Sequence, residues 1–284
     1  MKKPAYTPEY CEQQYNARLA IPDHPQIFAR WKEASRAARQ VLPCVLDVAY
    51  GSGPNEALDI FTARGSSRAL LTFLHGGFWR ALDKADFSFI AQPFVERGVT
   101  VAVVNYALAP SVPVETIVRQ TLAAHAWLYR NCEGYGAPRQ RVYVCGHSAG
   151  GHLTAMMLAA VWSAYAQGLP DDLIKGGLAI SGVYDLEPLL HVSFNSDMRL
   201  DASSVRKLNP VLYRPLRAVP LYTSVGGDES REFKRQNRLI ARTWEHCFRR
   251  DIPMPGFHHL GVVEQLGIPD SALFAGALEM MGLR

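Results

Sequence analysis

Short, continuous apolar runs alternate with longer amphipathic segments over most of the chain. Five such runs are typical of parallel strands that are buried on both faces: 69–74, 99–105, 141–145, 177–181 and 220–225. Segments with apolar residues at helical spacing follow these runs: 86–97, 114–130, 149–162, 230–248 and 271–281. Strands that alternate with helices predict an α/β fold with a mostly parallel central sheet flanked by helices.

The first part of the chain departs from this alternation. Residues 1–24 are polar, with Pro and Tyr, which favours a segment that lies on the surface. An apolar stripe at helical spacing predicts a helix over 25–41. Segments 44–50 and 57–61 flank a turn of Gly, Ser, Pro and Asn, and this pattern indicates an antiparallel hairpin.

The domain organisation follows from what interrupts the pattern. No repeat, low-complexity tract or long linker divides the chain, so we expect a single α/β domain over 1–284. Within it, 1–42 would form an N-terminal segment and helix. Residues 184–217 break the alternation of strands and helices and carry three prolines, which predicts a small cap insertion above the sheet edge.

Composition and charge narrow the class of protein. With 48% hydrophobic and 10% aromatic residues the chain can bury a sizeable core. No apolar run reaches the ~18 residues of a membrane span. The net charge is only +4 and the Arg residues are scattered, so we expect neither a membrane nor a nucleic-acid partner. The five cysteines form no Cys-x-x-Cys pair, and no signal peptide is recognisable, which favours the cytoplasm.

A serine between small residues follows the strand predicted at 141–145. The segment 146–150 reads Gly-His-Ser-Ala-Gly and fits the pattern Gly-x-Ser-x-Gly between a strand and a helix. Small neighbours are needed because such a turn crowds the backbone. The turn would lift the Ser148 hydroxyl clear of the backbone and place the Ala149 N–H at a helix N-terminus, where developing negative charge is stabilised. Ser148 is therefore our candidate nucleophile.

A second motif, His-Gly-Gly-Phe-Trp at 75–79, comes directly after the first parallel strand. Two glycines at a strand end let backbone N–H groups point into a cavity, and in Gly-x-Ser-x-Gly hydrolases this position supplies half of the oxyanion hole. We expect the N–H groups of Gly76, Gly77 or Phe78 to act there together with Ala149. The alternative is a tight turn in which the histidine is a buried structural residue.

A serine hydroxyl is a poor nucleophile unless an oriented base takes its proton. The expected chain order is serine, acid, histidine. We choose Asp228 as the acid because it follows the strand at 220–225 and has the shorter side chain; Glu229 is the alternative. We choose His259 as the base, with His258 as its alternative. Adjacent histidines can bind a metal, but no further ligand cluster accompanies them, so neither a metal nor a cofactor is expected.

Taken together, these motifs resemble α/β-hydrolase fold enzymes, on the side of hormone-sensitive-lipase-like esterases and arylformamidases (kynurenine formamidases). The segments that carry the resemblance cover nearly the whole chain: 14–18, 75–79, 105–110, 146–153 and 226–229. The resemblance implies Ser148 as the nucleophile, Asp228 as the acid and His259 as the base. The chain departs from many relatives around the base, where it has His-His-Leu in place of Asn-His-Phe. Hydrolases of this type are often homodimers.

These residues predict a serine hydrolase that cleaves a small carboxylic ester or an aryl formamide through an acyl-enzyme. We expect Trp79, Phe78 and Tyr184 to contact the small-molecule substrate, and the N-terminal helix to close the pocket through Phe28 or Trp31. An aromatic pocket of modest size favours a small acyl group and an aromatic leaving group. Ester and formamide remain equally open. The alternative class is a non-catalytic ligand-binding protein, because fold does not fix function.

Overall fold

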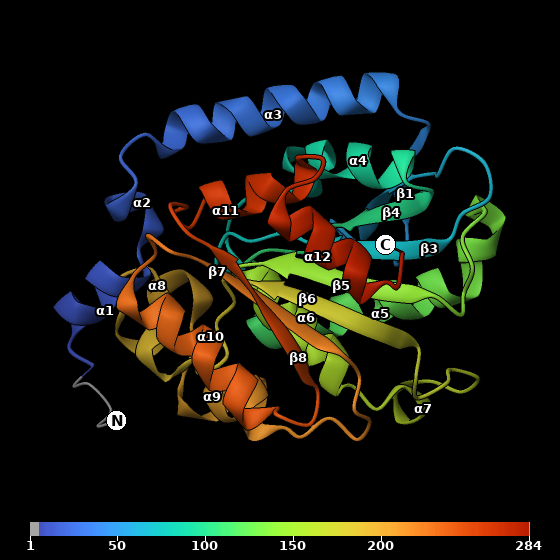
Figure 1. Ribbon diagram of the computed structural model, residues 1–284. Coiled ribbons are helices and arrows are strands. Elements are labelled where there is room, and N and C mark those ends of the chain that lie inside the picture. The colour runs from blue at the N-terminus through green and yellow to red at the C-terminus, as the bar shows by residue number, and fades with distance from the viewer. Residues whose placement is uncertain (1–5, 284) are drawn as a thin grey trace.

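An eight-stranded sheet forms the centre of the computed structural model, which describes residues 6–283 (Figure 1). The strands are β1 (Cys44–Ala49), β2 (Ala57–Phe61), β3 (Ala69–Leu74), β4 (Val99–Val104), β5 (Val142–His147), β6 (Ile174–Ile180), β7 (Leu221–Gly226) and β8 (Phe248–Met254). Their order in the sheet is β1-β2-β4-β3-β5-β6-β7-β8. β2 pairs antiparallel with β1 and β4, and the other pairs are parallel. The predicted α/β fold with an antiparallel N-terminal hairpin is confirmed.

Helices cover both faces of this sheet. The α-helices are α1 (Pro8–Tyr15), α2 (Ala17–Ala20), α3 (His24–Val41), α4 (Ala91–Glu96), α5 (Val114–Asn131), α6 (Ala149–Ala159), α7 (Trp162–Tyr165), α8 (Asn195–Met198), α9 (Ala202–Leu208), α10 (Arg231–Thr243), α11 (Gly261–Glu264) and α12 (Ala272–Met280). Short 3-10 turns are η1 (Lys84–Asp86), η2 (Ser88–Ile90), η3 (Cys132–Tyr135), η4 (Glu187–His191), η5 (Pro210–Leu212) and η6 (Gln265–Gly267). No helix within residues 6–283 has both the length and the apolar character needed to cross a membrane.

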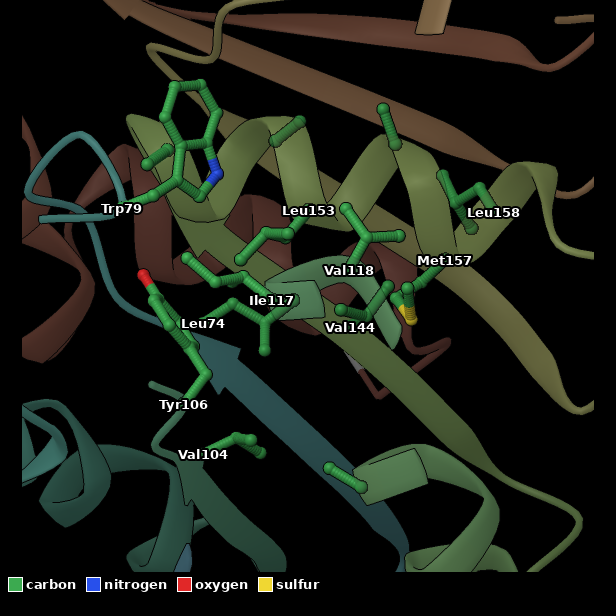
Figure 2. Packing of buried hydrophobic residues seen from close by; sticks show 14 of the residues in the cluster. Leu74, Trp79, Val104, Tyr106, Ile117, Val118, Val144, Leu153, Met157 and Leu158 are labelled. Atoms are coloured by element: carbon green, nitrogen blue, oxygen red, sulfur yellow. The ribbon is translucent and has the colours of Figure 1, made fainter. Parts of the chain in front are cut away.

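The central strands are apolar on both faces because each face packs against helices. Along β3, Leu70 and Leu74 join the hydrophobic cluster of α5, α6 and α10 (Figure 2), whereas Leu71 and Phe73 join the cluster of α3, α4 and α12. Side chains alternate between the two faces of a strand, so burial of both faces requires a continuous apolar run. This is why the sequence pattern predicted the central strands well.

The edge strand β8 was not predicted. Its seven residues include three consecutive charged positions, and only Ile252 and Met254 are buried. β8 pairs with β7 on one side alone, so the charged side chains of an edge strand can reach solvent. The helix expected over 230–248 therefore ends earlier, as α10 at Thr243, and the chain turns back into the sheet.

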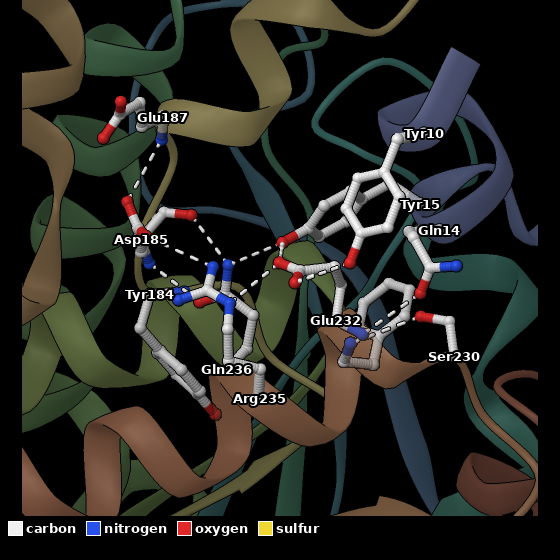
Figure 3. A network of polar contacts seen from close by, with 11 residues as sticks. Tyr10, Gln14, Tyr15, Tyr184, Asp185, Glu187, Ser230, Glu232, Arg235 and Gln236 are labelled. Carbon is white, nitrogen blue, oxygen red and sulfur yellow. Dashed lines mark hydrogen bonds and ion pairs between the residues drawn. The ribbon is translucent and has the colours of Figure 1, made fainter. Parts of the chain in front are cut away.

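The described part of the N-terminal segment is more than a surface strap. On α1, Cys11 and Tyr15 are fully buried, and the helix packs against α10. Figure 3 shows the polar side of this contact: the Tyr15 hydroxyl donates to Glu232 Oε2 at 2.8 Å and accepts from Gln236 Nε2 at 2.9 Å. This network fixes α1 and α2 beside the carboxyl ends of the strands, where the site lies.

The segment 184–217 lies between β6 and β7 and consists of η4, α8, α9 and η5 in place of a single crossover helix. Side chains of the main domain hold it. His152 Nε2 donates to the carbonyl of Leu208 at 2.7 Å, and Trp244 Nε1 donates to the carbonyl of Tyr213 at 2.8 Å. The insertion is thereby fixed next to α6 and α10, close to the carboxyl end of β5.

Candidate active site

Ser148 occupies the sharp turn between β5 and α6. Its φ of 57° and ψ of −117° lie in a region that is unfavourable for a non-glycine residue, as expected at a strained functional turn. A Cβ on Gly150 would lie 1.9 Å from the carbonyl oxygen of Leu74, and one on Gly146 would lie 2.1 Å from the Gly150 carbonyl oxygen. The two glycines of the motif are therefore required by close approach of backbone segments.

A continuous chain of hydrogen bonds runs from Ser148 to a carboxylate. Ser148 Oγ lies 3.0 Å from His259 Nε2, and His259 Nδ1 lies 2.7 Å from Glu229 Oε2. All three side chains are buried, with 2%, 6% and 6% of the residue surface exposed. Because the carboxylate accepts from Nδ1–H, the Nε2 lone pair is free to accept the serine proton.

The carboxylate beside the imidazole is Glu229, which corrects the choice of Asp228. The chain turns tightly after β7, where the N–H of Glu229 donates to the Gly226 carbonyl at 3.2 Å. This turn leaves Asp228 exposed and directs Glu229 inward. Glu229 Oε1 also accepts hydrogen bonds from the Ser181 hydroxyl and, at 2.7 Å, from the Gly226 N–H. Two further donors thus orient the carboxylate.

The two adjacent histidines have different roles in the structure. His258 Nδ1 accepts from the backbone N–H of Leu260 and Gly261 at 3.2 and 3.0 Å, so it caps α11, whereas the ring beside the serine is that of His259. The backbone carbonyl of His259 accepts a hydrogen bond from His147 Nε2 at 2.8 Å. Burial, and secondarily the neighbouring His259, hold the pKa of His147 well below its ordinary value, so this ring is a neutral donor.

The loop after β3 approaches the serine directly. A Cβ on Gly76 would lie 3.1 Å from Ser148 Cβ, and Gly77 and Phe78 both have positive φ, 103° and 50°. Among residues 6–283 we find no hydrogen-bond acceptor for the backbone N–H of Gly77 or Phe78. The N–H of Ala149, the first residue of α6, has no acceptor inside the helix. The backbone of Gly76 therefore passes close to Ser148, at the start of α6.

His75 holds this loop in place and is buried completely. Its ring stacks on Tyr106 with the centroids 4.2 Å apart, and its Nε2 lies 3.2 Å from Asn105 Oδ1. The Tyr106 hydroxyl donates to the His75 carbonyl at 2.6 Å. Burial lowers the pKa of His75. The histidine of the motif is therefore a structural residue, and the glycine after it, Gly76, approaches Ser148.

A cavity of about 510 Å³ opens at Ser148 and His259. Its walls come from four separate segments: α2 with the residue before it, the start of α3, the loop 77–82, and α8 with the two residues before it. Phe28 and Trp31 of α3 line the cavity, as expected. Phe78 lines it as well, and its ring lies 4.6 Å from that of Phe194. The cavity thus has aromatic side chains on two sides.

Two residues expected to contact substrate lie elsewhere. Trp79 is fully buried in the cluster of Figure 2, and its ring packs at a right angle to that of His152 with the centroids 5.0 Å apart. Tyr184 is fully buried beneath the insertion, and its backbone N–H donates to Gln236 (Figure 3). Neither residue lines the cavity. Both were chosen because they are aromatic residues near motifs, a pattern that does not separate core from pocket.

The sequence motifs missed several residues of the cavity wall. Arg80 and Asp197 line it and form an ion pair, with Arg80 Nε 2.7 Å from Asp197 Oδ2. Asn16 and Arg18 line it too, and both fall in the segment 14–18 that carries part of the resemblance. Within the described chain, no group of three His, Cys, Asp or Glu side chains is placed to hold a metal ion.

Comparisons with known proteins bear on the fold and on the general class of activity. A family model described as alpha/beta hydrolase fold matches residues 71–220, which is more than half of the chain. Kynurenine formamidase of Salmo salar is 30% identical over 99% of this chain and 97% of its own length, and that of Danio rerio is 27% identical over the same shares. The crystal structure of a candidate thioesterase from Silicibacter sp. superimposes with a TM-score of 0.82 and 29% identity, over 92% of this chain and 96% of that one.

Proposed function

This chain belongs to the α/β-hydrolase family, and we propose that it is a serine hydrolase. Its similarity to formamidases and esterases supports hydrolysis of an ester or an amide as its activity. It cleaves a small carboxylic ester or an aryl formamide through an acyl-enzyme. The observation that carries the proposal is the buried chain of contacts from Ser148 through His259 to Glu229, at 3.0 and 2.7 Å. A hydroxyl, an oriented imidazole and a buried carboxylate are the parts that acyl transfer to serine needs.

The proposed reaction has two halves. Ser148 Oγ forms a bond to the substrate carbonyl carbon while its proton passes to His259 Nε2. The resulting oxyanion accepts hydrogen bonds from backbone N–H groups of Ala149 and of Gly77 or Phe78, each worth about 3 kcal/mol. The bond to the leaving oxygen or nitrogen then breaks, and His259 returns the proton to that atom. In the second half, a water molecule gives a proton to His259 and attacks the carbonyl carbon of the acyl-enzyme. The bond to Ser148 Oγ breaks, Ser148 regains a proton from His259, and the carboxylic acid is released.

Glu229 contributes without taking the proton. Its carboxylate accepts the Nδ1–H bond of His259, which fixes the tautomer in which Nε2 is the base. It also stabilises the imidazolium that forms when Ser148 attacks. Burial strengthens this effect, since both side chains are largely shielded from solvent.

The shape of the cavity supports the substrate class. About 510 Å³ accommodates a small acyl group and one aromatic ring, and aromatic side chains line two of its sides. Two relatives are named kynurenine formamidases, so N-formylkynurenine is the first aryl formamide to test. The same serine chemistry serves short aryl esters, and the assay must include both.

The test is a substrate panel with the Ser148→Ala variant as the control. We expect turnover of p-nitrophenyl acetate or N-formylkynurenine, and a loss of at least 1,000-fold in kcat in the variant. A fluorophosphonate probe should label the wild-type protein at Ser148 and leave the variant unlabelled. Turnover that survives the Ser148→Ala change refutes the proposal, and a folded wild-type protein that is neither labelled nor active indicates a binding protein.

A further inference from the structure

The wall of the cavity contains one ion pair that the proposed chemistry does not use. Arg80 Nε lies 2.7 Å from Asp197 Oδ2, and the side chains are 31% and 37% exposed. A guanidinium has five N–H donors, and this contact with Asp197 uses the one on Nε. The terminal nitrogens of Arg80 are the part of the fork that can bind a carboxylate in a bidentate manner.

Arg80 is tied to the loop that faces the serine. Its backbone N–H donates to the carbonyl of Gly77 at 3.0 Å, so only one tight turn separates its Cα from the proposed oxyanion donors. Asp197 comes from α8 of the insertion, a separate segment of the cavity wall. The carboxylate of Asp197 therefore orients the guanidinium, while the hydrogen bond to Gly77 fixes the backbone of Arg80.

The charges along the cavity are unbalanced. Of the described residues that line the cavity, Asp197 is the sole acidic one, and it already forms an ion pair with Arg80. Arg18 adds a second guanidinium to the lining, 5.8 Å from the centroid of the Phe28 ring. Among the side chains that line the cavity, two guanidiniums thus accompany one carboxylate, whereas the Glu229 carboxylate lies behind His259 and does not line it. This lining favours a substrate that carries a carboxylate.

Aromatic side chains connect this charge to the serine. Phe78 contacts Phe194, and the Arg80 guanidinium lies 5.6 Å from the centroid of the Phe194 ring. On α3, Phe28 and Trp31 lie with their rings 5.3 Å apart and line the same cavity. An aromatic ring bound among these side chains would have its scissile bond toward Ser148 and a substituent within reach of Arg80.

We propose that Arg80, oriented by Asp197, is the specificity-determining residue, and that it binds a carboxylate carried by the aromatic part of the substrate. This inference rests on the proposed function, because it assumes that the cavity at Ser148 binds the substrate. It defines the substrate class further: aryl esters or aryl formamides with an anionic substituent. A charge-assisted bidentate contact of this kind is worth roughly 10- to 100-fold in kcat/KM.

The test compares matched esters with the same scissile bond. One pair is 3-acetoxybenzoate and 3-acetoxybenzamide; the second is 3-(3-acetoxyphenyl)propionate and its amide, which extends the reach of the charge. For each protein, the measured quantity is the ratio of kcat/KM for the acid to that for the amide. We expect Arg80→Gln to lower this ratio at least tenfold in one of the pairs, mainly through KM, and Arg80→Lys to lower it less.

Two further variants separate recognition from a purely structural role. Asp197→Asn should reduce the ratio by a smaller factor than Arg80→Gln, since the guanidinium stays but loses its orientation. Arg36→Gln removes the same charge from an exposed ion pair with Glu33 on α3 and should leave the ratio unchanged. Melting temperatures of all variants show whether loss of the link between loop and insertion unfolds the protein. A merely structural pair would affect the acid and the amide equally.

The outcomes decide the inference separately from the proposed function. A ratio in Arg80→Gln that stays within threefold of wild type in both pairs overturns the role of Arg80. If Arg80→Gln does not fold, the Arg80→Lys variant is measured in its place. Inhibition of the wild-type enzyme by 3-hydroxybenzoate is then also compared with inhibition by 3-hydroxybenzamide, and equal inhibition by the two overturns the inference. If the wild type turns over neither these four esters nor N-formylkynurenine, and so equals Ser148→Ala, the proposed function itself is refuted.

Discussion

Replacing Glu229 by Gln tests which carboxylate orients the base. The Gly226 N–H donates to Oε1 of Glu229 at 2.7 Å, so a glutamine there must keep its carbonyl oxygen toward Gly226. Its NH2 group then faces His259 Nδ1, where the carboxylate oxygen now lies at 2.7 Å. A donor at this position stabilises the tautomer with the proton on Nε2, and that nitrogen can no longer accept the proton of Ser148.

The magnitude follows from this change of tautomer. Loss of the carboxylate at an equivalent buried position in a serine protease lowers kcat about 10⁴-fold, which corresponds to about 5.5 kcal/mol of transition-state stabilisation. Here the side chains of His259 and Glu229 are 7% and 0% exposed, so solvent cannot readily replace the carboxylate as the acceptor for Nδ1–H. We therefore expect Glu229→Gln to lower kcat for p-nitrophenyl acetate by 10³- to 10⁴-fold, with little change in KM.

The matched control is the neighbouring carboxylate. Asp228→Asn removes the same charge one residue earlier, from an exposed side chain, and kcat should stay within threefold of wild type. Circular dichroism and melting temperatures establish that both variants fold. The reasoning fails if Glu229→Gln retains more than a tenth of the wild-type kcat, or if Asp228→Asn is the variant that loses activity.

Three other predictions follow from the packing around the site. Gly150→Ala would place a methyl group 1.9 Å from the Leu74 carbonyl oxygen, so its free energy of unfolding in urea should fall by more than about 3 kcal/mol; an unchanged midpoint would contradict the close approach. His258→Ala removes a cap of α11 and should cost about 1 kcal/mol of stability while kcat stays within threefold; a loss like that expected for a base would reverse the assignment. Burial lowers the pKa of His125 and of His152 to about 4, so each is neutral in the folded chain and protonated in the unfolded chain below about pH 6.5. Stability should therefore fall as the pH drops from about 6.5 to 4, on the order of 3 kcal/mol for each residue, and the His125→Gln and His152→Gln variants should each show a shallower decline in urea titrations.

The parts of the fold that the sequence predicted are those where burial alone determines the pattern. β3 and β4 are flanked on both faces by helices, and their apolar runs match the strands residue for residue or nearly so. One edge of β8 faces solvent, so its sequence contains charged residues and has a pattern like that of a helix end or a loop. The choice of Asp228 was wrong for a different reason: it rested on side-chain length, whereas the tight turn after β7 leaves Asp228 exposed and buries Glu229.

The serine was predictable because it follows a local pattern at the carboxyl end of a strand, whereas the histidine was chosen by its place after the acid in the chain order. Parallel strands bring the segments that carry both residues to one edge of the sheet. The cavity wall has no such pattern. Arg18, Arg80 and Asp197 come from a helix before the sheet, a loop after β3 and the insertion after β6, and only tertiary packing places them around one space. Since none of these residues supports the sheet, the wall can change without disturbing Ser148, His259 or Glu229. Substitutions at these positions should therefore alter which ester or formamide is preferred, whereas changes in the hydrogen-bonded chain should lower turnover of every substrate.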